Sequence, residues 1–184
     1  MFNPGRRIIV CGATGTGKTT VAKSIARLLG LPHIELDAIF WTPGWVSKPP
    51  QQFRANVSAV LDNNPGGWVI DGNYSRVRDL ILPLADTVVW LRPPFRVAFW
   101  RLFKRTVRRA WSGEILWGNN RESWRLSFLS RDSLLLYAIT TWRRHHKKTR
   151  QAFDTILHHA NIIELRSILE IEKFLAGLPA TESG

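Results

Sequence analysis

Three absences limit what this chain of 184 residues can be. Cys11 is its single cysteine, so no disulfide can form within the chain, and a small secreted scaffold held by disulfides is excluded. No apolar run approaches the roughly 20 residues that a membrane-spanning helix needs, so we expect no membrane partner. The first residues lack the hydrophobic stretch and cleavage site of a signal peptide, and we therefore expect a cytoplasmic location.

Acidic residues are scarce in one part of the chain. Residues 92–151 hold 15 of the 26 Lys and Arg but only 3 of the 14 Asp and Glu, so the whole formal charge of +12 arises there. A concentrated positive field attracts anions, namely nucleotide phosphates, nucleic acid or acidic lipid. A solvated basic face that aids solubility is the alternative interpretation.

The chain alternates apolar strands with amphipathic helices. Apolar, β-branched runs predict strands at Arg6–Cys11, His33–Leu36, Trp68–Asp71, Asp86–Leu91 and Asn161–Leu165. Helical spacing predicts helices at Lys18–Leu29, Gln51–Leu61, Ser75–Leu84, Pro94–Ala110, Glu122–Arg150 and Ser167–Ala176. Trp41–Pro50 and Trp111–Asn120 are interpreted as loops. Because the sequence has no repeat or low-complexity linker, we predict one α/β domain over residues 1–184, with a parallel sheet covered by helices on both faces.

The most specific motif lies between the first strand and the first helix. Residues 12–19 read GATGTGKT, which fits the P-loop pattern G-x-x-x-x-G-K-[ST] at every position. Its glycines let backbone N–H groups turn toward an anion, and the helix adds the positive end of its dipole. Lys18 can reach the β- and γ-phosphates, and Thr19 can ligate Mg²⁺. The alternative is that this segment is a glycine-rich turn that matches the pattern by chance. The predicted ATP site comprises Gly12, Ala13, Thr14, Gly15, Thr16, Gly17, Lys18, Thr19 and Thr20.

Two carboxylates follow strands of the predicted sheet. Ligands of open parallel sheets bind beyond the carboxyl ends of the strands, where Asp37 and Asp71 lie. Phosphoryl transfer needs oxygen ligands for a metal, and it benefits from a group that orients or deprotonates the acceptor. We therefore predict that Asp71 joins Thr19 in holding Mg²⁺ and that Asp37 contacts the acceptor as a base. Capping of a helix or turn is the alternative for each carboxylate.

Residues around these carboxylates are candidates for binding the acceptor. A glycine after Asp71 permits an unusual turn, and the arginine that follows in DGNYSR can pair with a phosphate on the acceptor, unless it forms only a surface salt bridge. Two tryptophans just beyond Asp37 can stack on a flat ring, although core packing is the commoner role of a tryptophan. The predicted acceptor site comprises Asp37, Trp41, Trp45, Gly72, Asn73 and Arg76.

The basic helix and the segment after it are predicted to act on the phosphates. Arg101, Arg105 and Arg109 recur at i, i+4 and i+8, which places them close to one helix face. The glycine-containing segment at about 110–122 can form a mobile lid that brings Arg121 over the phosphates and excludes water. We predict catalytic roles for Arg105, Arg109 and Arg121. A solvated helix and a surface loop are the alternative.

The motifs together resemble a known family. The chain is similar, over about residues 6–175, to bacterial adenylate kinase-like proteins often called DNA topology modulation proteins. The segments that carry the resemblance read HIELD at 33–37, WTPGW at 41–45, WVIDGNYS at 68–75 and LWGNNRES at 116–123. More distantly, the chain resembles nucleoside monophosphate kinases and shikimate or gluconate kinases.

This resemblance implies a fold and further site residues. The fold is the three-layer P-loop NTPase fold, with a five-stranded parallel sheet in the order 2-3-1-4-5 and a basic helical lid region after the fourth strand. Arg105 would contact ATP, as would Arg166 in a base-binding loop after the fifth strand. Adenylate kinases carry a DG-x-x-R motif before the acceptor site. Here Asp71 and Gly72 match that motif, but the arginine is Arg76, one residue later.

The sequence thus predicts an ATP-binding phosphotransferase that needs Mg²⁺ and transfers the γ-phosphoryl group to a small acceptor, such as a nucleotide. The alternative is a nucleic-acid-binding P-loop ATPase or regulator that uses residues 92–151, where the run WRRHHKKTR at 142–150 would contact a nucleic-acid backbone. The two adjacent histidines of that run lack metal-site spacing. A GTPase is disfavoured because the chain has no Asn-Lys-x-Asp motif. The acceptor and the oligomeric state stay open.

Overall fold

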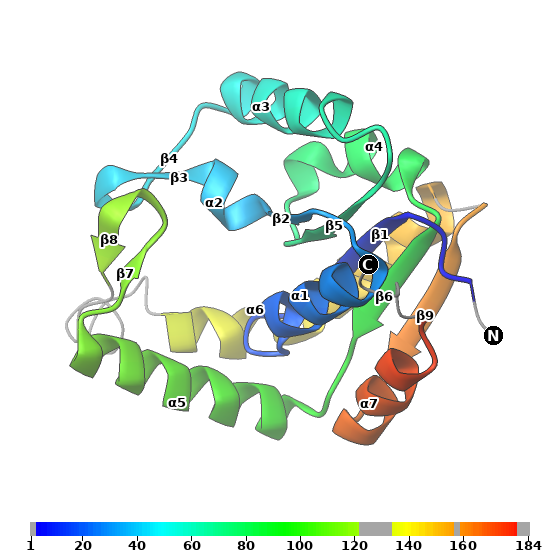
Figure 1. Cartoon of the computed structure of the whole chain (residues 1–184). Helices are drawn as coiled ribbons and strands as arrows, with labels where there is room; N and C mark the ends of the chain where they lie inside the picture. The colour runs from blue at the N-terminus through cyan, green and yellow to red at the C-terminus, as the bar shows by residue number, and fades with distance from the viewer. Residues whose placement is uncertain (1–2, 122–133, 157–158, 180–184) are drawn as a thin grey trace.

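A parallel sheet of five strands forms the centre of the protein. The structure is a computed structural model that describes residues 3–121, 134–156 and 159–179. The strands are β1 (Arg7–Gly12), β2 (His33–Glu35), β5 (Trp68–Asp71), β6 (Thr87–Leu91) and β9 (Asn161–Leu165). They lie in the order β2-β5-β1-β6-β9 (Figure 1). Counted along the chain this order is 2-3-1-4-5, so the predicted fold class and strand order are confirmed.

Helices cover both faces of the sheet. In β1, Ile8 and Val10 belong to one core, which α1 (Lys18–Leu29) and α7 (Ile168–Ala176) complete. Ile9 and Cys11 of the same strand belong to the other core, with residues of α3 (Pro50–Asp62), α4 (Arg78–Ile81) and α6 (Leu134–Ile156). Burial on both faces explains why the strands read as nearly continuous apolar runs.

Left-handed glycines set the ends of α1. Gly17 precedes the helix with a φ of 94°, and Gly30 follows it with a φ of 60°. Glycine adopts these angles without the steric penalty of a Cβ atom. Val21, Ala22 and Ile25 bury the apolar face of α1 against the sheet. The segment between β1 and α1 is therefore anchored at both ends.

Two segments that were predicted as loops contain short β-hairpins. The strands are β3 (Trp41–Thr42) with β4 (Val46–Ser47), and β7 (Ile115–Leu116) with β8 (Asn120–Arg121). The basic helix α5 (Phe95–Ser112) ends at Gly113, which has a φ of 63°, so the second hairpin follows α5 within the segment that was predicted as a loop. We call the second hairpin, residues 115–121, the lid hairpin.

The hairpin turns have the same backbone signature. Gly44 and Trp45 have φ values of 77° and 58°, and Gly118 and Asn119 have values of 67° and 58°. Two consecutive left-handed residues form the tight turn whose twist matches that of paired strands. Strands of two residues are too short to show an alternating pattern in the sequence, which is why these hairpins were not predicted.

Other boundaries differ from the predictions. β2 ends at Glu35, and Asp37 lies in the first turn of a short helix, α2 (Leu36–Phe40), instead of directly after the strand. α6 continues beyond the predicted end at Arg150, whereas residues 122–133 of that predicted helix lie outside the described residues. In the described parts of the chain, no helix combines the length and apolarity needed to cross a bilayer.

Candidate active site

The P-loop is held in shape by its neighbours. Gly15 has a φ of 83°, and a Cβ atom built on it would lie 2.3 Å from the carbonyl oxygen of Ala98 in α5. A Cβ atom on Gly12 would lie 2.7 Å from the carbonyl oxygen of Leu91 in β6. Only glycine fits at Gly12 and Gly15, because the backbone of β6 and of α5 lies too close for a side chain.

The N-terminus of α1 fits an anion. The first N–H groups of a helix have no partners within it, and the helix dipole places partial positive charge there. Among the described residues, no side chain caps α1 at Gly17, and its first turn carries no acid. Lys18 Nζ donates a 3.0 Å hydrogen bond to the Ala13 carbonyl oxygen. Burial lowers the pKa of Lys18, whereas Asp37 and Asp71 stabilise its charge. This set of N–H groups and one ammonium fits the phosphates of a nucleotide.

Thr19 and Asp71, which were predicted to share a metal, meet at the carboxyl edge of the sheet. Thr19 Oγ1 donates a 2.6 Å hydrogen bond to Asp71 Oδ2. His33 Nε2 lies 2.9 Å from Asp71 Oδ1, and the Asp71 residue is only 2% exposed. The sheet register places Glu35 beside Asp71, with Glu35 Oε1 3.4 Å from Thr19 Oγ1. Hydroxyl and carboxylate oxygens are the ligands that Mg²⁺ prefers, so these donors fit the predicted metal.

Asp37 lies close to the P-loop lysine. Its carboxylate stabilises the charge of Lys18, and its Oδ1 accepts a hydrogen bond from the Tyr74 hydroxyl. Burial and the neighbouring Asp37 raise the pKa of Tyr74, so the phenol stays a hydrogen-bond donor at neutral pH. An acceptor hydroxyl next to Asp37 would therefore lie near the phosphates that Lys18 is predicted to contact.

Aromatic rings form a wall beside Asp37. Trp41 packs edge-on against Phe40 at 4.9 Å between ring centroids and against Trp45 at 5.5 Å. Phe40 in turn lies 4.6 Å from the Tyr74 ring. The structure thus brings both predicted tryptophans together. Because their rings contact other rings, part of their role is packing.

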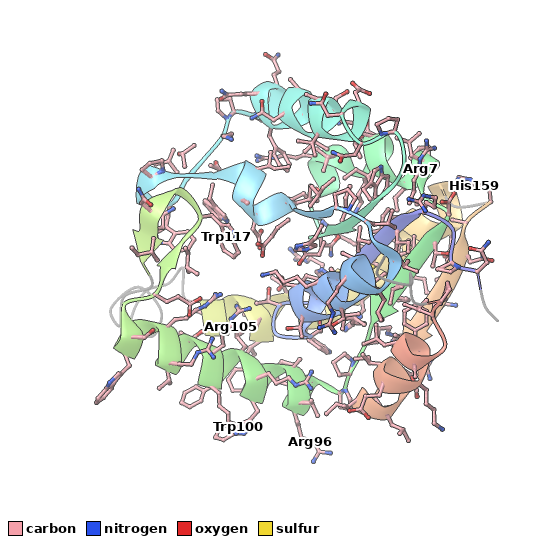
Figure 2. The ribbon with its side chains drawn as sticks, in the orientation of Figure 1. Arg7, Arg96, Trp100, Arg105, Trp117 and His159 are labelled. Atoms are coloured by element: carbon pink, nitrogen blue, oxygen red, sulfur yellow. The ribbon has the colours of Figure 1, made fainter. Side chains whose placement is uncertain are left out.

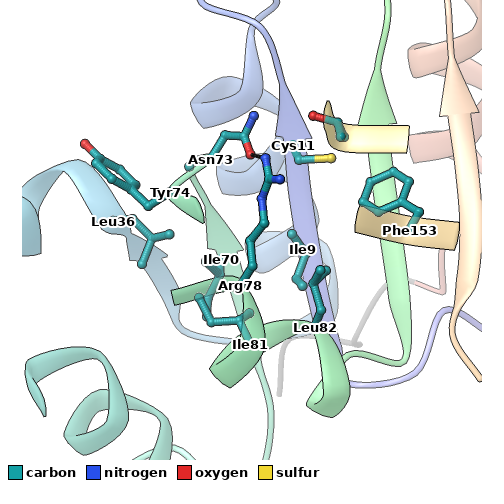
Figure 3. A pocket seen from close by; sticks show the side chains of 12 residues that line it. Ile9, Cys11, Leu36, Ile70, Asn73, Tyr74, Arg78, Ile81, Leu82 and Phe153 are labelled. Carbon is teal, nitrogen blue, oxygen red and sulfur yellow. Dashed lines mark hydrogen bonds between the residues drawn. The ribbon is translucent and has the colours of Figure 1, made fainter. Parts of the chain in front are cut away.

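Asn73 faces the protein interior. Arg78 Nη2 donates a 2.5 Å hydrogen bond to Asn73 Oδ1, and Asn73 Nδ2 donates to His145 Nε2 from α6. Figure 3 shows the Arg78 guanidinium reaching Asn73 beside Cys11. Asn73, Arg78 and Cys11 line a cavity of about 30 Å³ under the carboxyl edge of the sheet. The Cys11 thiol stays protonated there at neutral pH, because burial raises its pKa to about 12.

The other two predicted residues of the DGNYSR segment differ in position. A Cβ atom on Gly72, whose φ is 133°, would lie 2.8 Å from the Leu36 side chain, so this glycine permits close packing against α2. Arg76 is exposed, and its guanidinium carbon lies 5.9 Å from the centre of the Phe40 ring. Asn73 therefore lies inside and Arg76 at the surface of the same segment.

The predicted arginines occupy several environments. Arg105 lies on the side of α5 that faces the rest of the molecule (Figure 2), and its charge contributes to the lowered pKa of Lys18, after burial. Arg109 Nε lies 3.4 Å from Glu114 Oε1. Arg121 lies in β8 opposite Ile115, and its side chain is outside the described part.

Arg101 lies beside the P-loop, whereas Thr20 and Arg166 are exposed. Arg101 Nη1 lies 3.6 Å from the position of a Cβ atom on Gly17, so this arginine, which the predicted site omitted, adjoins the P-loop. Thr20 is exposed on α1. Arg166 is exposed beyond β9, and its Nε donates a 2.7 Å hydrogen bond to Glu164 Oε1.

The lid hairpin contacts Glu35 and the first hairpin. Trp117 lies between the hairpin and α2 (Figure 2), and its Nε1 donates a 3.0 Å hydrogen bond to Glu35 Oε2. Asn120, only 4% exposed, donates from Nδ2 to the Thr42 carbonyl oxygen at 2.9 Å, and its Oδ1 accepts from the Trp45 N–H at 2.9 Å. Glu35, Trp117 and Asn120 were not among the predicted site residues. Only Glu35 had a usable signal, its place at a strand end.

Three solved structures with this architecture are a gluconokinase, a shikimate kinase and a sugar kinase. A gluconokinase from Sinorhizobium meliloti 1021 superposes with a TM-score of 0.53 and 19% identity, covering 96% of this chain and 94% of that chain. The chain has their fold. A shikimate kinase from Acinetobacter baumannii in complex with shikimate gives 0.51 and 19% identity, covering 92% and 90%. A sugar kinase from Janibacter sp. HTCC2649 gives 0.53 and 18% identity, covering 94% of each chain.

Sequence comparison adds two similarities. A shikimate kinase from Halorhodospira halophila (strain DSM 244 / SL1) is 35% identical over 116 residues, a match that spans 55% of this chain and 65% of that enzyme. The model of the ATPase family associated with various cellular activities (AAA) matches residues 8–71. That segment runs from β1 to the end of β5 and includes the P-loop, Glu35 and Asp71.

Proposed function

We propose that this protein is an ATP-dependent kinase that transfers the γ-phosphoryl group of ATP to a hydroxyl group of a small molecule. The observation that carries the proposal is the 2.6 Å contact between Thr19 Oγ1 and Asp71 Oδ2 at the N-terminus of α1. It joins a phosphate cradle, the Lys18 ammonium and oxygen ligands suited to Mg²⁺ at one edge of the sheet. In this proposal residues 12–20 bind ATP. Mg²⁺ is held by Thr19 and, directly or through water, by Asp71.

Asp37 is proposed to act on the acceptor. Its carboxylate lies near Lys18 and is held by the Tyr74 hydroxyl. As the acceptor oxygen bonds to the γ-phosphorus and the bond to ADP breaks, Asp37 would take the proton of the acceptor hydroxyl. Lys18, Arg101 and Arg105 would stabilise the negative charge of the transferring group, and bound Mg²⁺ would neutralise the phosphate oxygens.

The acceptor is proposed to be a small polyhydroxylated molecule. The similar proteins are named for shikimate, gluconate and sugar, all of which carry several hydroxyl groups. Glu35 and Asp37 can accept hydrogen bonds from hydroxyl groups, and the wall of Trp41, Trp45 and Tyr74 offers apolar ring faces. A nucleotide, the acceptor that the sequence analysis named first, is the second class to assay.

The lid hairpin supports a kinase over a simple ATPase. Its contacts with Glu35 and Thr42 cover the acceptor side of the P-loop. A covered site limits the access of water, which would otherwise compete with the acceptor for the γ-phosphoryl group.

The test is a screen in which ADP release is measured with shikimate, gluconate, neutral sugars, nucleosides and nucleoside monophosphates as acceptors. We expect one class to stimulate ADP release and Lys18→Ala to abolish the stimulation. Lys23→Ala is the matched control, because Lys23 is an exposed lysine on the same helix. Failure of every acceptor to raise ADP release above the rate without acceptor would refute the proposal.

The same assay tests the nucleic-acid alternative. The resemblance to DNA topology modulation proteins stays a prediction, and the family name does not by itself establish an activity on DNA. ADP release that duplex DNA stimulates, and that small hydroxyl compounds do not, would replace the kinase by a DNA-dependent ATPase. That stimulation should fall as salt concentration rises, because it would depend on phosphate contacts.

A further inference from the structure

Helix α5 has two faces with opposite properties. Ala98, Leu102 and Thr106 are fully buried on the face that packs toward the P-loop. The opposite face follows the spacing i, i+3, i+4, i+7, i+8 and i+11, which places its residues in one row along the helix. We call this row the outer stripe; it consists of Trp100, Phe103, Lys104, Val107, Arg108 and Trp111.

Four of the six residues in the outer stripe are apolar, and both of its tryptophans are exposed. Trp100 is 55% exposed and Trp111 is 85% exposed, and Figure 2 shows Trp100 and Arg96 directed away from the body of the protein. Between the two tryptophans, stripe residues and Ser112 line an open groove of about 330 Å³. Exposed apolar surface of this kind on a single helix marks an interaction site more often than an accident of folding.

The charge of α5 indicates an anionic partner. The helix carries six cationic residues and no acidic one. Arg101, Arg105 and Arg109 follow the inward face, whereas Arg96, Lys104 and Arg108 accompany the outer stripe. A second copy of the chain does not fit this face, because two such helices would bring like charges together around the tryptophans. Arg108 Nη2 lies 3.6 Å from Glu114 Oε2, but its side chain is 73% exposed and can still meet a partner.

The geometry of the rings favours a lipid surface over a nucleic acid. The Trp100 and Phe103 rings are stacked with 10° between their planes, and Lys104 Nζ lies 5.2 Å from the Trp100 centroid. A nucleobase on Trp100 would compete with these neighbours, whereas headgroup contacts around the ring would not. Val107 adds an aliphatic side chain. Base stacking uses aromatic rings and has no need of it, whereas the boundary between lipid headgroups and acyl chains accommodates it.

We propose that the outer stripe of α5 docks this protein on the surface of an anionic phospholipid bilayer. The helix lies parallel to the membrane plane, and Trp100 and Trp111, about 16 Å apart along its axis at roughly 1.5 Å per residue, enter the headgroup region. Lys104 and Arg108 contact lipid phosphates. The expectation of no membrane partner came from the absence of a spanning segment, and a helix that lies on the surface needs none.

Sedimentation with vesicles tests the proposal on the full chain. We expect binding to vesicles of phosphatidylcholine mixed with phosphatidylglycerol, little binding to phosphatidylcholine alone, and weaker binding at higher salt. The double variant Trp100→Ser with Trp111→Ser should bind at least about tenfold more weakly, as should Lys104→Glu with Arg108→Glu. The ADP-release rate with vesicles absent should stay unchanged, since no stripe residue belongs to the proposed active site.

Matched controls separate the stripe from general surface effects. Ile168→Ser with Leu169→Ser removes apolar side chains of similar exposure from α7, at 51% and 58%. Lys23→Glu with Arg27→Glu makes the same charge change on α1, where both residues are exposed. Both controls should bind vesicles nearly as well as the wild type. Equal binding by the stripe variants, or binding that ignores lipid charge, would overturn the proposal. Stripe-dependent binding of a single-stranded oligonucleotide without vesicle binding would assign the surface to nucleic acid instead.

Discussion

The indole N–H of Trp117 donates a 3.0 Å hydrogen bond to Oε2 of Glu35, although 82 residues separate them in the sequence. The other carboxylate oxygen of Glu35 lies 3.4 Å from the hydroxyl of Thr19 in the first turn of α1. One carboxylate therefore connects the lid hairpin with the P-loop. In the proposed kinase, this connection couples coverage of the acceptor to the nucleotide site.

Trp117→Phe tests this coupling, because it keeps an aromatic ring and removes only the N–H donor. A hydrogen bond to a charged group contributes about 1.5–3 kcal/mol, so we expect kcat/KM for the acceptor to fall roughly tenfold or more. ATP hydrolysis without acceptor should rise as water enters the site. Trp100→Phe on the outer stripe is the control and should change neither rate. Unchanged kinetics in Trp117→Phe would show that the contact has no part in turnover.

Asp71→Asn tests the proposed metal site with little change in shape. The amide keeps one oxygen but loses the charge that faces Thr19 and His33. We expect the Mg²⁺ concentration for half-maximal turnover to rise and kcat to fall by roughly a hundredfold. Asp79→Asn is the control, since Asp79 is 59% exposed and pairs with Arg54 at the surface. Normal Mg²⁺ dependence in Asp71→Asn would remove Asp71 from the site.

Gly15→Ala tests the close approach of α5 to the P-loop. The new Cβ atom would lie 2.3 Å from the Ala98 carbonyl oxygen, and the φ of 83° is unfavourable for alanine. Overpacking and left-handed strain each cost about 1–3 kcal/mol, so urea unfolding should show a loss of at least about 2 kcal/mol. Gly66→Ala, whose Cβ atom meets nothing within 4 Å, should be neutral or slightly stabilising. Equal stabilities of the two variants would contradict the packing described here.

We expect the free energy of unfolding to fall in mild acid because of His145. Burial, with Lys18, His146 and Arg78 nearby, lowers its pKa from 6.5 to about 4. Arg78 fixes the Asn73 amide so that its N–H₂ group donates to His145, and the ring must therefore accept at Nε2 and stay neutral. A protonated ring would carry a proton on Nε2, so its N–H would face the N–H of the Asn73 amide and the hydrogen bond would be lost.

The sign of the effect follows from the depressed pKa. The folded protein binds fewer protons than the unfolded chain between the two pKa values, so His145 contributes its full stability above about pH 6.5 and loses it progressively toward about pH 4. The whole shift corresponds to about 3 kcal/mol. Urea unfolding at pH 7.5, 6 and 5 should show a steeper decline for the wild type than for His145→Gln, which keeps an acceptor that does not titrate. Parallel declines would exclude His145 as the source.

Several features could be predicted from local sequence because local physics decides them. The GATGTGKT segment predicted the bend between β1 and α1, since glycine angles and a helix start are properties of adjacent residues. Alternating strands and helices predicted the parallel sheet, because short right-handed crossovers leave few alternatives. The strand order also places Asp71 beside Thr19, although 52 residues separate them in the sequence.

Other features depend on contacts that no local pattern encodes. The hairpins at 41–47 and 115–121 have strands of two residues. The Asn120 side chain of the second hairpin hydrogen-bonds to backbone groups of Thr42 and Trp45 in the first. The pairing of Trp117 with Glu35 needs the length and direction of α5, which carries the lid hairpin back over α2 (Figure 1). Asn73 and His145 were named separately in the sequence, and only the packing of α6 under the sheet joins them.

By itself, then, the sequence determined the glycine-rich bend between β1 and α1, the sheet and the edge where the carboxylates gather, because glycine geometry, apolar periodicity and strand order act over short stretches of chain. Tertiary structure alone decided which face of α5 is buried against Gly15 and which presents Trp100 and Trp111 to solvent. It also decided that Trp117 of the lid hairpin donates its hydrogen bond to Glu35. These choices depend on the free energy of packing between elements distant in sequence, where many pairings satisfy the same local pattern and only one fills the space.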